Sequence, residues 1–390
     1  MRVLITTDWY KPAVNGVVTS VVNLSNGLEA AGHEVCILTL SGSLRSYCSG
    51  NVTHIGSIGV GLVYPNARLK MAQSDRFVRQ LVEWKPDIVH SQCEFSTFFL
   101  AKRIARECGA PLVHTYHTVY EDFTHYFSPS VRFGRLMAAA FSRRILSAAQ
   151  AVIVPTEKIS ALLQGYGVAQ PIAVIPSGLA LGQFQVRPGK AERDAARRRL
   201  GFAEEDRVLL FLGRLAQEKN LEELLKFMVR QSSRVKLLLV GDGPYRGRLT
   251  DAVRELHLED RVVFAGMVRP EEVARYYALG DVFVSASRSE TQGLTYVEAM
   301  AAGLPPLCRD DPCLAEMIRD GVNGFHYRSE AEFDAKLERL LEDEPFRRAM
   351  AAAARETAFG RFSAEKFAAG VLAEYRDLLN SARAERTTAA

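Results

Sequence analysis

Short apolar runs alternate with helix-forming stretches along this chain, and this rhythm limits the possible folds more than any single residue does. The apolar runs of the first half lie at 3–5, 35–38, 88–89, 112–113 and 152–154. Each has the length of a strand, and its unbroken apolar character is typical of a strand buried on both faces. The stretches with helical character lie at about 17–31, 74–84, 96–108 and 131–149. Strands that alternate with helices predict a parallel sheet with helices on both faces.

The same rhythm begins again after about residue 205. Its apolar runs lie at 208–211, 237–240, 262–264 and 282–284. Between the two halves, residues 175–182 are rich in proline and glycine and have no helical period, which is typical of a linker. A chain of 390 residues is also longer than one ordinary core requires. We therefore predict an α/β protein of two Rossmann-like, doubly wound domains facing each other across a cleft, with residues 1–176 in the first domain and 177–360 in the second.

Composition and charge narrow the class of protein. The chain is 48% hydrophobic and 24% charged, which is typical of a soluble globular protein. Its six cysteines form no C-x-x-C pair, so we expect neither a disulfide framework nor a zinc site. No signal peptide is recognisable before the run at 3–5, and we expect a cytoplasmic protein. Residues 1–176 include 16 basic and 11 acidic residues, and this positive charge favours contact with an anionic membrane surface.

Two glutamates, Glu290 and Glu298, flank seven residues that include Gly293, and helix-forming residues follow. A helix that starts near Gly293 directs its free backbone N–H groups and the positive end of its dipole toward whatever lies before it, which creates an anion site. Carboxylates at such a place bind hydroxyl groups rather than phosphate. Hydrogen-bond donors for phosphate beside acceptors for hydroxyl groups are typical of a pocket for a nucleotide sugar.

Three motifs of the second half occur in the order known from one enzyme family. They are Gly213-Arg214-Leu215 with Lys219, Gly241-Asp242-Gly243-Pro244, and the pair Glu290 and Glu298 with seven residues between them. Together they resemble the retaining glycosyltransferases of family 4, which have the GT-B architecture. The resemblance covers nearly the whole chain. It implies that the C-terminal helices, at about 361–380, pack back on the first domain.

The resemblance assigns the donor site to named positions. Arg214 and Lys219 would bind the diphosphate and stabilise it as it leaves, because cations at the C-terminal ends of parallel strands face the ligand. Glu290 would bind the transferred sugar and Glu298 the ribose. The other positions expected to contact the donor are Gly16, Gly241, Met267, Gly293, Leu294 and Thr295. Many family members have two glycines where this chain has Asn15 before Gly16, so the role is assigned to Gly16.

The histidine His117 is similar to the family histidine that contacts the sugar near the reacting carbon. A neutral imidazole there binds a sugar hydroxyl, whereas the neighbouring His114 fits a core position equally well. No Asp-x-Asp metal motif stands at a suitable strand end, so we expect no obligatory metal or other cofactor, and a UDP-sugar as substrate. The family retains the anomeric configuration, and we favour front-face attack. The predicted catalytic residues are His117, Arg214, Lys219 and Glu290.

The acceptor is suggested by a narrower resemblance. The segment 114–127 is similar to the diacylglycerol glucosyltransferases of Gram-positive bacteria, and so are 15–20 and 289–295. Those enzymes move α-glucose from UDP-glucose to diacylglycerol on the cytoplasmic face of the membrane. Aromatic side chains with polar tips suit the headgroup region of a bilayer. The aromatic residues predicted on the acceptor side are Tyr116, Tyr120, Phe123 and Tyr126.

The stretch 131–149 predicts an amphipathic helix on the same side. Its apolar residues at every fourth position are Phe133, Met137, Phe141 and Ile145. Its arginines on another face are Arg132, Arg135 and Arg143. We expect the apolar stripe to pack on the sheet of the protein itself and the arginines to contact anionic lipid.

The predicted function is therefore transfer of α-glucose from UDP-glucose to 1,2-diacylglycerol at the inner face of the cell membrane. Other donors, other acceptors and a different enzyme class stay open as alternatives. The donor sugar could be galactose or mannose on UDP or GDP, and the acceptor could be another lipid or a soluble molecule. A nucleotide-sugar epimerase can use the same two-domain architecture. Nucleic acid is excluded as a partner, because the charges of the second half balance and no nucleic-acid-binding motif is present.

Overall fold

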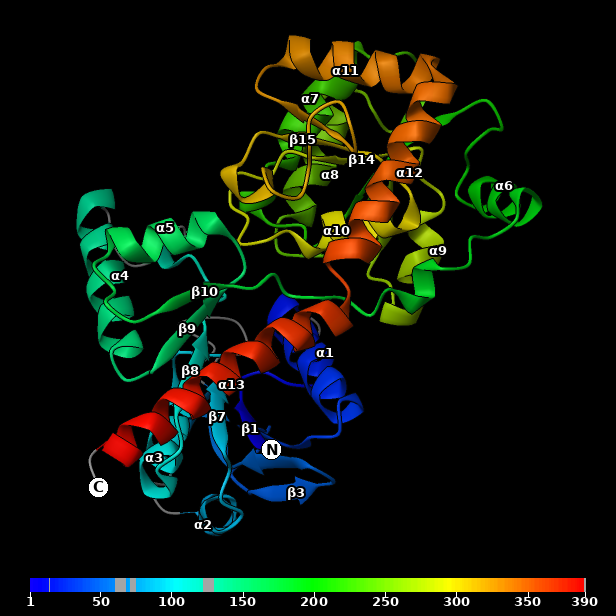
Figure 1. Cartoon of the computed structure of the whole chain (residues 1–390). Coiled ribbons are helices and arrows are strands. Elements are labelled where there is room, and N and C mark those ends of the chain that lie inside the picture. Colours follow the sequence, from blue (N-terminus) through cyan, green and yellow to red (C-terminus); the bar gives the residue numbers. More distant parts are fainter. Residues whose placement is uncertain (14, 60–67, 71–74, 122–129, 389–390) are drawn as a thin grey trace. The chain divides into compact units, whose positions relative to one another are not determined.

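The computed structural model describes residues 1–13, 15–59, 68–70, 75–121 and 130–388. The chain forms two compact units (Figure 1). Unit 1 contains Met1–Gly178 together with the C-terminal segment Ala364–Ala390, and unit 2 contains Leu179–Ser363. The return of the C-terminal segment to unit 1 means that the chain passes from one unit to the other twice.

Unit 1 is built on a mixed sheet with the strand order β10-β9-β8-β7-β1-β2-β4-β3, in which the pair β3–β4 is antiparallel and the other pairs are parallel. Its strands are β1 (Arg2–Thr6), β2 (Glu34–Leu40), β3 (Tyr47–Ser49), β4 (Val52–Ile55), β7 (Ile88–Ser91), β8 (Leu112–Thr115), β9 (Ala151–Val154) and β10 (Ile172–Val174). A separate ribbon pairs β5 (Ser57–Gly59) with β6 (Arg68–Lys70). The predicted runs of the first half therefore all lie in strands of one sheet.

Helices cover both faces of this sheet. They are α1 (Gly16–Ala30), α2 (Arg76–Glu83), α3 (Ser96–Cys108), α4 (Val131–Leu146), α5 (Glu157–Gly165) and α13 (Ala364–Thr388). Val3 and Ile5 of β1 share a core with α1 and α13, whereas Leu4 between them packs with α2, α3 and α4. Figure 1 shows α13 running beside α1. A side chain at Gly27 of α1 would place its Cβ 2.5 Å from the Cβ of Ala368, so glycine permits this close approach.

Unit 2 is built on a parallel sheet with the strand order β13-β12-β11-β14-β15-β16. Its strands are β11 (Arg207–Leu212), β12 (Val235–Val240), β13 (Val262–Gly266), β14 (Val282–Ser285), β15 (Pro306–Arg309) and β16 (Phe325–Tyr327). Its α-helices are α6 (Lys190–Arg199), α7 (Leu221–Arg230), α8 (Arg246–Glu255), α9 (Val273–Tyr277), α10 (Leu294–Ala302), α11 (Glu330–Glu342) and α12 (Glu344–Arg361). Alternate residues of β11 again point to opposite cores, with Leu210 packing toward α9, α10 and α12 and Leu209 toward α7, α8 and α11.

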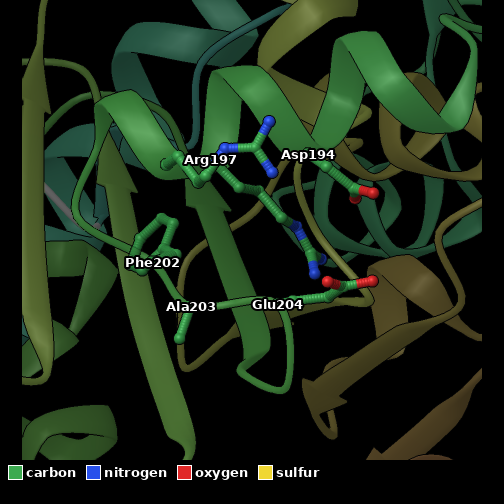
Figure 2. A pocket seen from close by; sticks show the side chains of 6 residues that line it. Asp194, Arg197, Phe202, Ala203 and Glu204 are labelled. Carbon is green, nitrogen blue, oxygen red and sulfur yellow. The ribbon is translucent and has the colours of Figure 1, made fainter.

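The charged helix α6 carries one buried charged residue, Arg197. Its guanidinium donates to the backbone oxygen of Leu279 at 2.7 Å and to the carboxylate of Asp281 at 2.8 Å. Arg197 lines a small hollow together with Asp194, Phe202 and Glu204 (Figure 2). Asp281 directly precedes β14, so this ion pair lies at the N-terminal end of the sheet. Ligands of parallel sheets bind at the C-terminal end, and we assign the hollow a structural role.

Candidate functional site

The loops that follow β11 and β12 are joined through their backbones at the C-terminal end of the sheet of unit 2. The amide of Leu215 donates to the oxygen of Asp242 at 3.0 Å, and the amide of Tyr245 donates to the oxygen of Leu215 at 3.0 Å. A Cβ on Gly241, whose φ is +126°, would lie 2.0 Å from the oxygen of Gly213. The loop after β12 therefore needs glycine at position 241 to lie this close to the loop after β11.

The structure brings Lys219 and Glu290 together across 71 positions of sequence. Lys219 ends the short 3₁₀ turn Gln217–Lys219 after β11, and Glu290 lies in the loop after the neighbouring strand β14. The Lys219 Nζ lies 2.7 Å from Glu290 Oε1, and the two side chains are only 21% and 11% exposed. A charge pair of this kind has lost much of its water and gains from the short distance. Arg214 is more exposed and forms an ion pair with Glu218.

The helix α10 begins at Leu294, directly after Gly293. Gly293 adopts a left-handed conformation with φ +80°, and a Cβ there would lie 2.7 Å from the ring of Tyr296. Its N-cap residue, Gly293, has no side chain that could cap the helix. The backbone N–H groups of Leu294 and Thr295 lie at the N-terminus of this nine-residue helix, where an anion is favoured.

Glu298 lies one turn into α10, on the same face as Thr295. Its Oε2 accepts a hydrogen bond of 2.9 Å from the hydroxyl of Tyr277, which also lies 3.0 Å from the backbone oxygen of Thr295. Burial raises the pKa of the Glu298 carboxyl from its ordinary value of 4.5 to about 7. The carboxyl group is therefore held near its protonation midpoint at neutral pH.

The loop after β13 lies next to the loop of Gly241. The amide of Gly241 donates to the oxygen of Gly266 at 2.8 Å, and Met267 follows as an exposed residue. The predicted donor residues of unit 2 thus come from the ends of β11, β12, β13 and β14 and from the start of α10. These four strands are neighbours in the sheet, which is why their ends meet.

One residue of this region was not identified from the sequence. Glu223 of α7 accepts from Arg288 at 3.1 Å, from Arg309 at 2.6 Å and from the hydroxyl of Tyr327 at 3.1 Å. It therefore positions two arginines that follow or end β14 and β15. The partners are far away in the sequence, so no local pattern indicates them. The sequence form Asn220-Leu-Glu-Glu223 suggests a capping box, but the Asn220 side chain donates to the Glu223 carboxylate instead of capping the helix.

In unit 1, Gly16 is the first residue of α1, and Asn15 is its N-cap. The Asn15 side-chain oxygen accepts a hydrogen bond of 2.9 Å from the amide of Val18. Asn15 therefore satisfies one of the free N–H groups of the helix, a task that a glycine could not perform.

The two histidines of the 114–117 segment have different surroundings. His117 is half-buried, and its Nε2 lies 2.7 Å from Gln92 Oε1. Burial lowers the pKa of His117 to about 4, so its ring is neutral at physiological pH. His114 is fully buried and lies 3.4 Å from Glu94 Oε1. His114 therefore belongs to the interior of unit 1.

The aromatic residues predicted on the acceptor side differ in how deeply they are buried. Tyr116 is fully buried and its hydroxyl lies 2.9 Å from that of Ser142, so its assignment to the acceptor surface is wrong. Strand alternation at the end of β8 turns this side chain into the core. Tyr120 is half-buried and donates to Glu94 at 2.7 Å. Phe123 and Tyr126 lie outside the described residues.

The apolar stripe of α4 is only partly covered, which corrects the expectation that it packs on the sheet. Ile145 is buried and Phe141 stacks on Phe95 at 6.0 Å, but Phe133 is 57% exposed and Met137 is 46% exposed. The exposed large apolar residues at the start of α3 and in the first half of α4 are Phe95, Phe99, Phe133, Leu136 and Met137, and we refer to them together as the apolar patch. The exposed arginines of the same helix are Arg132, Arg135, Arg143 and Arg144. Arg135 pairs with Glu121 at 3.0 Å.

Within the described part of the chain, no helix combines the length and the apolar character that a bilayer-crossing segment needs. The same residues contain no group of three or more histidine, cysteine or acidic side chains arranged to hold a metal ion.

Comparison with known proteins places the chain in a family. Residues 14–183 match the profile of Glycosyltransferase Family 4, and residues 192–357 match that of the Glycosyl transferases group 1. The α-monoglucosyldiacylglycerol synthase of Streptococcus pneumoniae is 36% identical over 347 residues, which cover 87% of this chain and 78% of that protein. The synthase of the same name from Acholeplasma laidlawii is 34% identical over 346 residues, which cover 85% and 86%.

A solved structure shares the fold. The Anabaena protein HepE in complex with UDP superimposes with a TM-score of 0.75 and 19% identity, over 97% of this chain and all of that one. Glycosyltransferases of this family use the nucleotide sugar as substrate and require no cofactor. The chain has the GT-B fold and belongs to the glycosyltransferases of family 4.

Proposed function

We propose that this protein transfers α-glucose from UDP-glucose to the free hydroxyl of 1,2-diacylglycerol, at the inner face of the cell membrane. The observation that carries this proposal is the identity of 36% and 34% to two α-monoglucosyldiacylglycerol synthases, over more than three quarters of each relative. The donor region of unit 2 and the apolar patch of unit 1 support it, because they offer partners for a nucleotide sugar and for a lipid.

The donor would bind along the strand ends of unit 2. The diphosphate would be held by Lys219 and Arg214 and by the N-terminus of α10, each of which presents positive charge. Glu290, held 2.7 Å from Lys219, would bind hydroxyl groups of the glucose directly beside the diphosphate. The Glu298 carboxyl and the loop of Gly241 and Met267 would receive the ribose and the base.

Transfer with retention would proceed at one face of the sugar. The bond between C1 of glucose and the phosphate oxygen breaks, and the acceptor oxygen forms its bond to C1 on the same face. The leaving UDP oxygen takes the proton of the acceptor hydroxyl. Lys219 and Arg214 would stabilise the negative charge that develops on the diphosphate. His117, neutral in this structure, would bind a hydroxyl of the transferred sugar. Trapping of a covalent glycosyl-enzyme would contradict this mechanism.

The acceptor would reach the enzyme from a membrane surface. The apolar patch exposes three phenylalanines, a leucine and a methionine, and burying such side chains in lipid contributes roughly 25 cal/mol per Å² of apolar area. Arginines on α4 lie beside it, and each basic residue near an anionic surface contributes about 1 kcal/mol. An amphipathic surface with these two components suits binding in the plane of the interface.

Replacing Arg132, Arg135 and Arg143 with alanine is expected to weaken binding to anionic vesicles by about 10- to 100-fold and to leave binding to neutral vesicles nearly unchanged. Vesicle co-sedimentation measures both. The matched control replaces the exposed Arg45, Arg79 and Arg106, which removes the same charge from other parts of unit 1. An equal loss in the control, or an equal loss on neutral vesicles, would remove the electrostatic argument for α4. Phe133→Ser with Leu136→Ser should instead weaken binding to both kinds of vesicle.

The reaction itself is tested with UDP-[¹⁴C]glucose and diacylglycerol in mixed anionic vesicles, with UDP-galactose and GDP-mannose in parallel. We expect a labelled, alkali-labile glycolipid with an α linkage from UDP-glucose. UDP release without a lipid product would assign a soluble acceptor. A labelled product from one of the other donors would change the sugar. Conversion of UDP-N-acetylglucosamine without any acceptor would replace the proposal with an epimerase.

A further inference from the structure

We propose that Gln92 is a positioning residue for His117, whose carboxamide keeps the ring hydrogen of His117 on Nε2 and leaves Nδ1 to accept a hydrogen bond from a sugar hydroxyl. The identity of that ligand rests on the proposed function above. The state of the ring does not, because it follows from contacts within unit 1 alone.

A chain of hydrogen bonds begins at His117 and runs into the interior of unit 1. His117 Nε2 lies 2.7 Å from Gln92 Oε1, and Gln92 Nε2 lies 3.1 Å from His90 Nε2. The same His90 nitrogen lies 2.7 Å from the hydroxyl of Thr115, and His90 Nδ1 lies 2.6 Å from the hydroxyl of Tyr375. Gln92, His90, Thr115 and Tyr375 are all at most 1% exposed. Water therefore does not compete for these contacts.

The orientation of the Gln92 carboxamide, with its oxygen toward His117 and its nitrogen toward His90, determines where the hydrogens are. An amide oxygen only accepts and an amide nitrogen only donates. His117 must therefore carry its hydrogen on Nε2 to donate to Gln92, and His90 Nε2 must accept from Gln92. Complete burial lowers the pKa of His90 well below its usual value, so that ring is neutral. Its one hydrogen is then on Nδ1 and is donated to the Tyr375 oxygen.

The fixed hydrogen decides what His117 offers to a ligand. A neutral imidazole has one donor and one acceptor nitrogen. With Nε2–H engaged by Gln92, the remaining nitrogen is the acceptor Nδ1, for which the described residues provide no partner. An acceptor suits a sugar hydroxyl, which can donate, and does not suit a phosphate oxygen, which cannot. Gln92 thereby determines that His117 recognises the sugar rather than the diphosphate.

The C-terminal helix supports this arrangement. Tyr375 belongs to α13, which packs on unit 1 beside α1, and its hydroxyl is the last group of the hydrogen-bond chain. The ring of His90 meets that of Tyr375 edge to face with centroids 5.7 Å apart. The helix α13 follows unit 2 in the sequence, yet it contributes the buried hydroxyl of Tyr375 to the hydrogen-bond chain of unit 1.

The ring state is measured by long-range ¹H–¹⁵N correlation spectra of the full chain labelled with ¹⁵N-histidine. The signal of His117 is assigned among the eight histidines with a His117→Gln variant. At pH 7 we expect the pattern of a neutral ring with the hydrogen on Nε2. In Gln92→Leu we expect a mixture of the two tautomers, because leucine neither accepts nor donates. The proposal would be overturned if the His117 ring of the wild-type protein carried its hydrogen on Nδ1. It would also be overturned if Gln92→Leu left the tautomer of His117 unchanged.

Two more variants show whether the direct contact is responsible. Tyr375→Phe removes the last hydroxyl of the chain and leaves the Gln92–His117 contact in place, so His117 should keep its hydrogen on Nε2. Gln92→Glu places a negative charge beside the ring and should raise the pKa of His117 by about one to three pH units. Gln80→Glu adds the same charge on the exposed face of α2 and should leave the His117 titration unchanged. Equal titrations of His117 in both glutamate variants would contradict the assigned contact.

The kinetic consequence separates this inference from the proposed function. Gln92→Leu should lower kcat/KM for UDP-glucose on the order of 10- to 100-fold, as expected for loss of a group that orients a ligand-binding histidine. If the wild-type protein transfers no glucose but His117 shows the expected tautomer and its loss in Gln92→Leu, the positioning role stands and the proposed function fails. If transfer occurs but the tautomer of His117 is independent of Gln92, the proposed function stands and the positioning role fails.

Discussion

Lys219→Ala is expected to lower the rate of glucose transfer by about 10²- to 10³-fold or more while the protein still folds. The ammonium of Lys219 is the cation that the structure places 2.7 Å from Glu290, at the predicted junction of diphosphate and sugar. Loss of a fixed positive group that meets developing negative charge typically costs this much in kcat. Steady-state and single-turnover assays with UDP-glucose and diacylglycerol measure the effect, and circular dichroism checks the fold.

The same substitution also removes the Lys219 ammonium from its ion pair with Glu290. Because Glu290 is 11% exposed, we expect a loss of about 1 to 3 kcal/mol in the free energy of unfolding. The double variant Lys219→Met with Glu290→Gln removes both charges and should recover most of this stability without recovering transfer. Glu290→Ala alone should also abolish transfer. Lys226→Ala, which removes an exposed lysine of α7, is the control for charge. Normal turnover in Lys219→Ala or Glu290→Ala would refute the site assignment.

Glu298→Gln is expected to make the protein more stable at alkaline pH and to weaken donor binding at the same time. The folded protein binds a proton at Glu298 more tightly than the unfolded chain, because burial raises the pKa from 4.5 to about 7. The free energy of unfolding therefore falls as pH rises from about 4.5 through 7, and stays lower above that pH. The total loss from this group is about 3 kcal/mol.

The difference between the wild-type protein and Glu298→Gln isolates this contribution. Asp8 of unit 1 has a pKa raised to about 6 by burial and produces a loss of the same sign, but it is present in both proteins and cancels. Denaturant unfolding at pH 5 and pH 8.5 should show a much smaller pH dependence in the variant. Glu338→Gln, at an exposed position of α11, should retain the wild-type dependence. A pH dependence unchanged in Glu298→Gln would show that this carboxyl is not held near neutrality.

Glu298→Gln should weaken donor binding, although it stabilises the folded protein at alkaline pH. A carboxylate that accepts hydrogen bonds from ribose hydroxyl groups contributes about 1.5 to 3 kcal/mol, so the KM for UDP-glucose should rise by about 10- to 100-fold in Glu298→Gln. Tyr277→Phe removes the hydroxyl that lies 2.9 Å from Glu298 and should change the KM less, since the carboxyl remains. Unaltered binding of UDP-glucose by Glu298→Gln would remove Glu298 from the donor site.

Local pattern was sufficient for the strands and for part of the site. The runs at 208–211 and 237–240 lie in β11 and β12, because strands buried on both faces have no polar residues to interrupt them. Parallel strands also bring their C-terminal ends to one edge, which explains why motif order alone placed Lys219 and Glu290 in the same region. These features depend on chain neighbours and on a general rule of sheet geometry.

Burial of individual side chains was less predictable. Tyr116 combines an aromatic ring with a polar hydroxyl, which is the property predicted for an acceptor residue. Its side chain is nevertheless buried in the core. Arg197 belongs to a charged run, yet it is buried against Asp281. The stripe of α4 has one helical period throughout, and only its second half is covered. Periodicity shows which residues of a helix share a face. How much of that face is covered depends on how far along the helix the neighbouring elements extend.

The sequence by itself determined the two α/β units, the positions of nine of their strands and the family to which the chain belongs, because these follow from periodicity and from motifs that are local in the chain. Only the tertiary structure decided that Gln92 contacts His117, that Tyr375 of α13 lies behind this pair, and that Glu223 holds Arg288 and Arg309. These contacts join residues up to 285 positions apart, and their side chains carry no local signal of the partner. Such contacts form when packing brings buried polar groups together and leaves each of them to find a partner away from water.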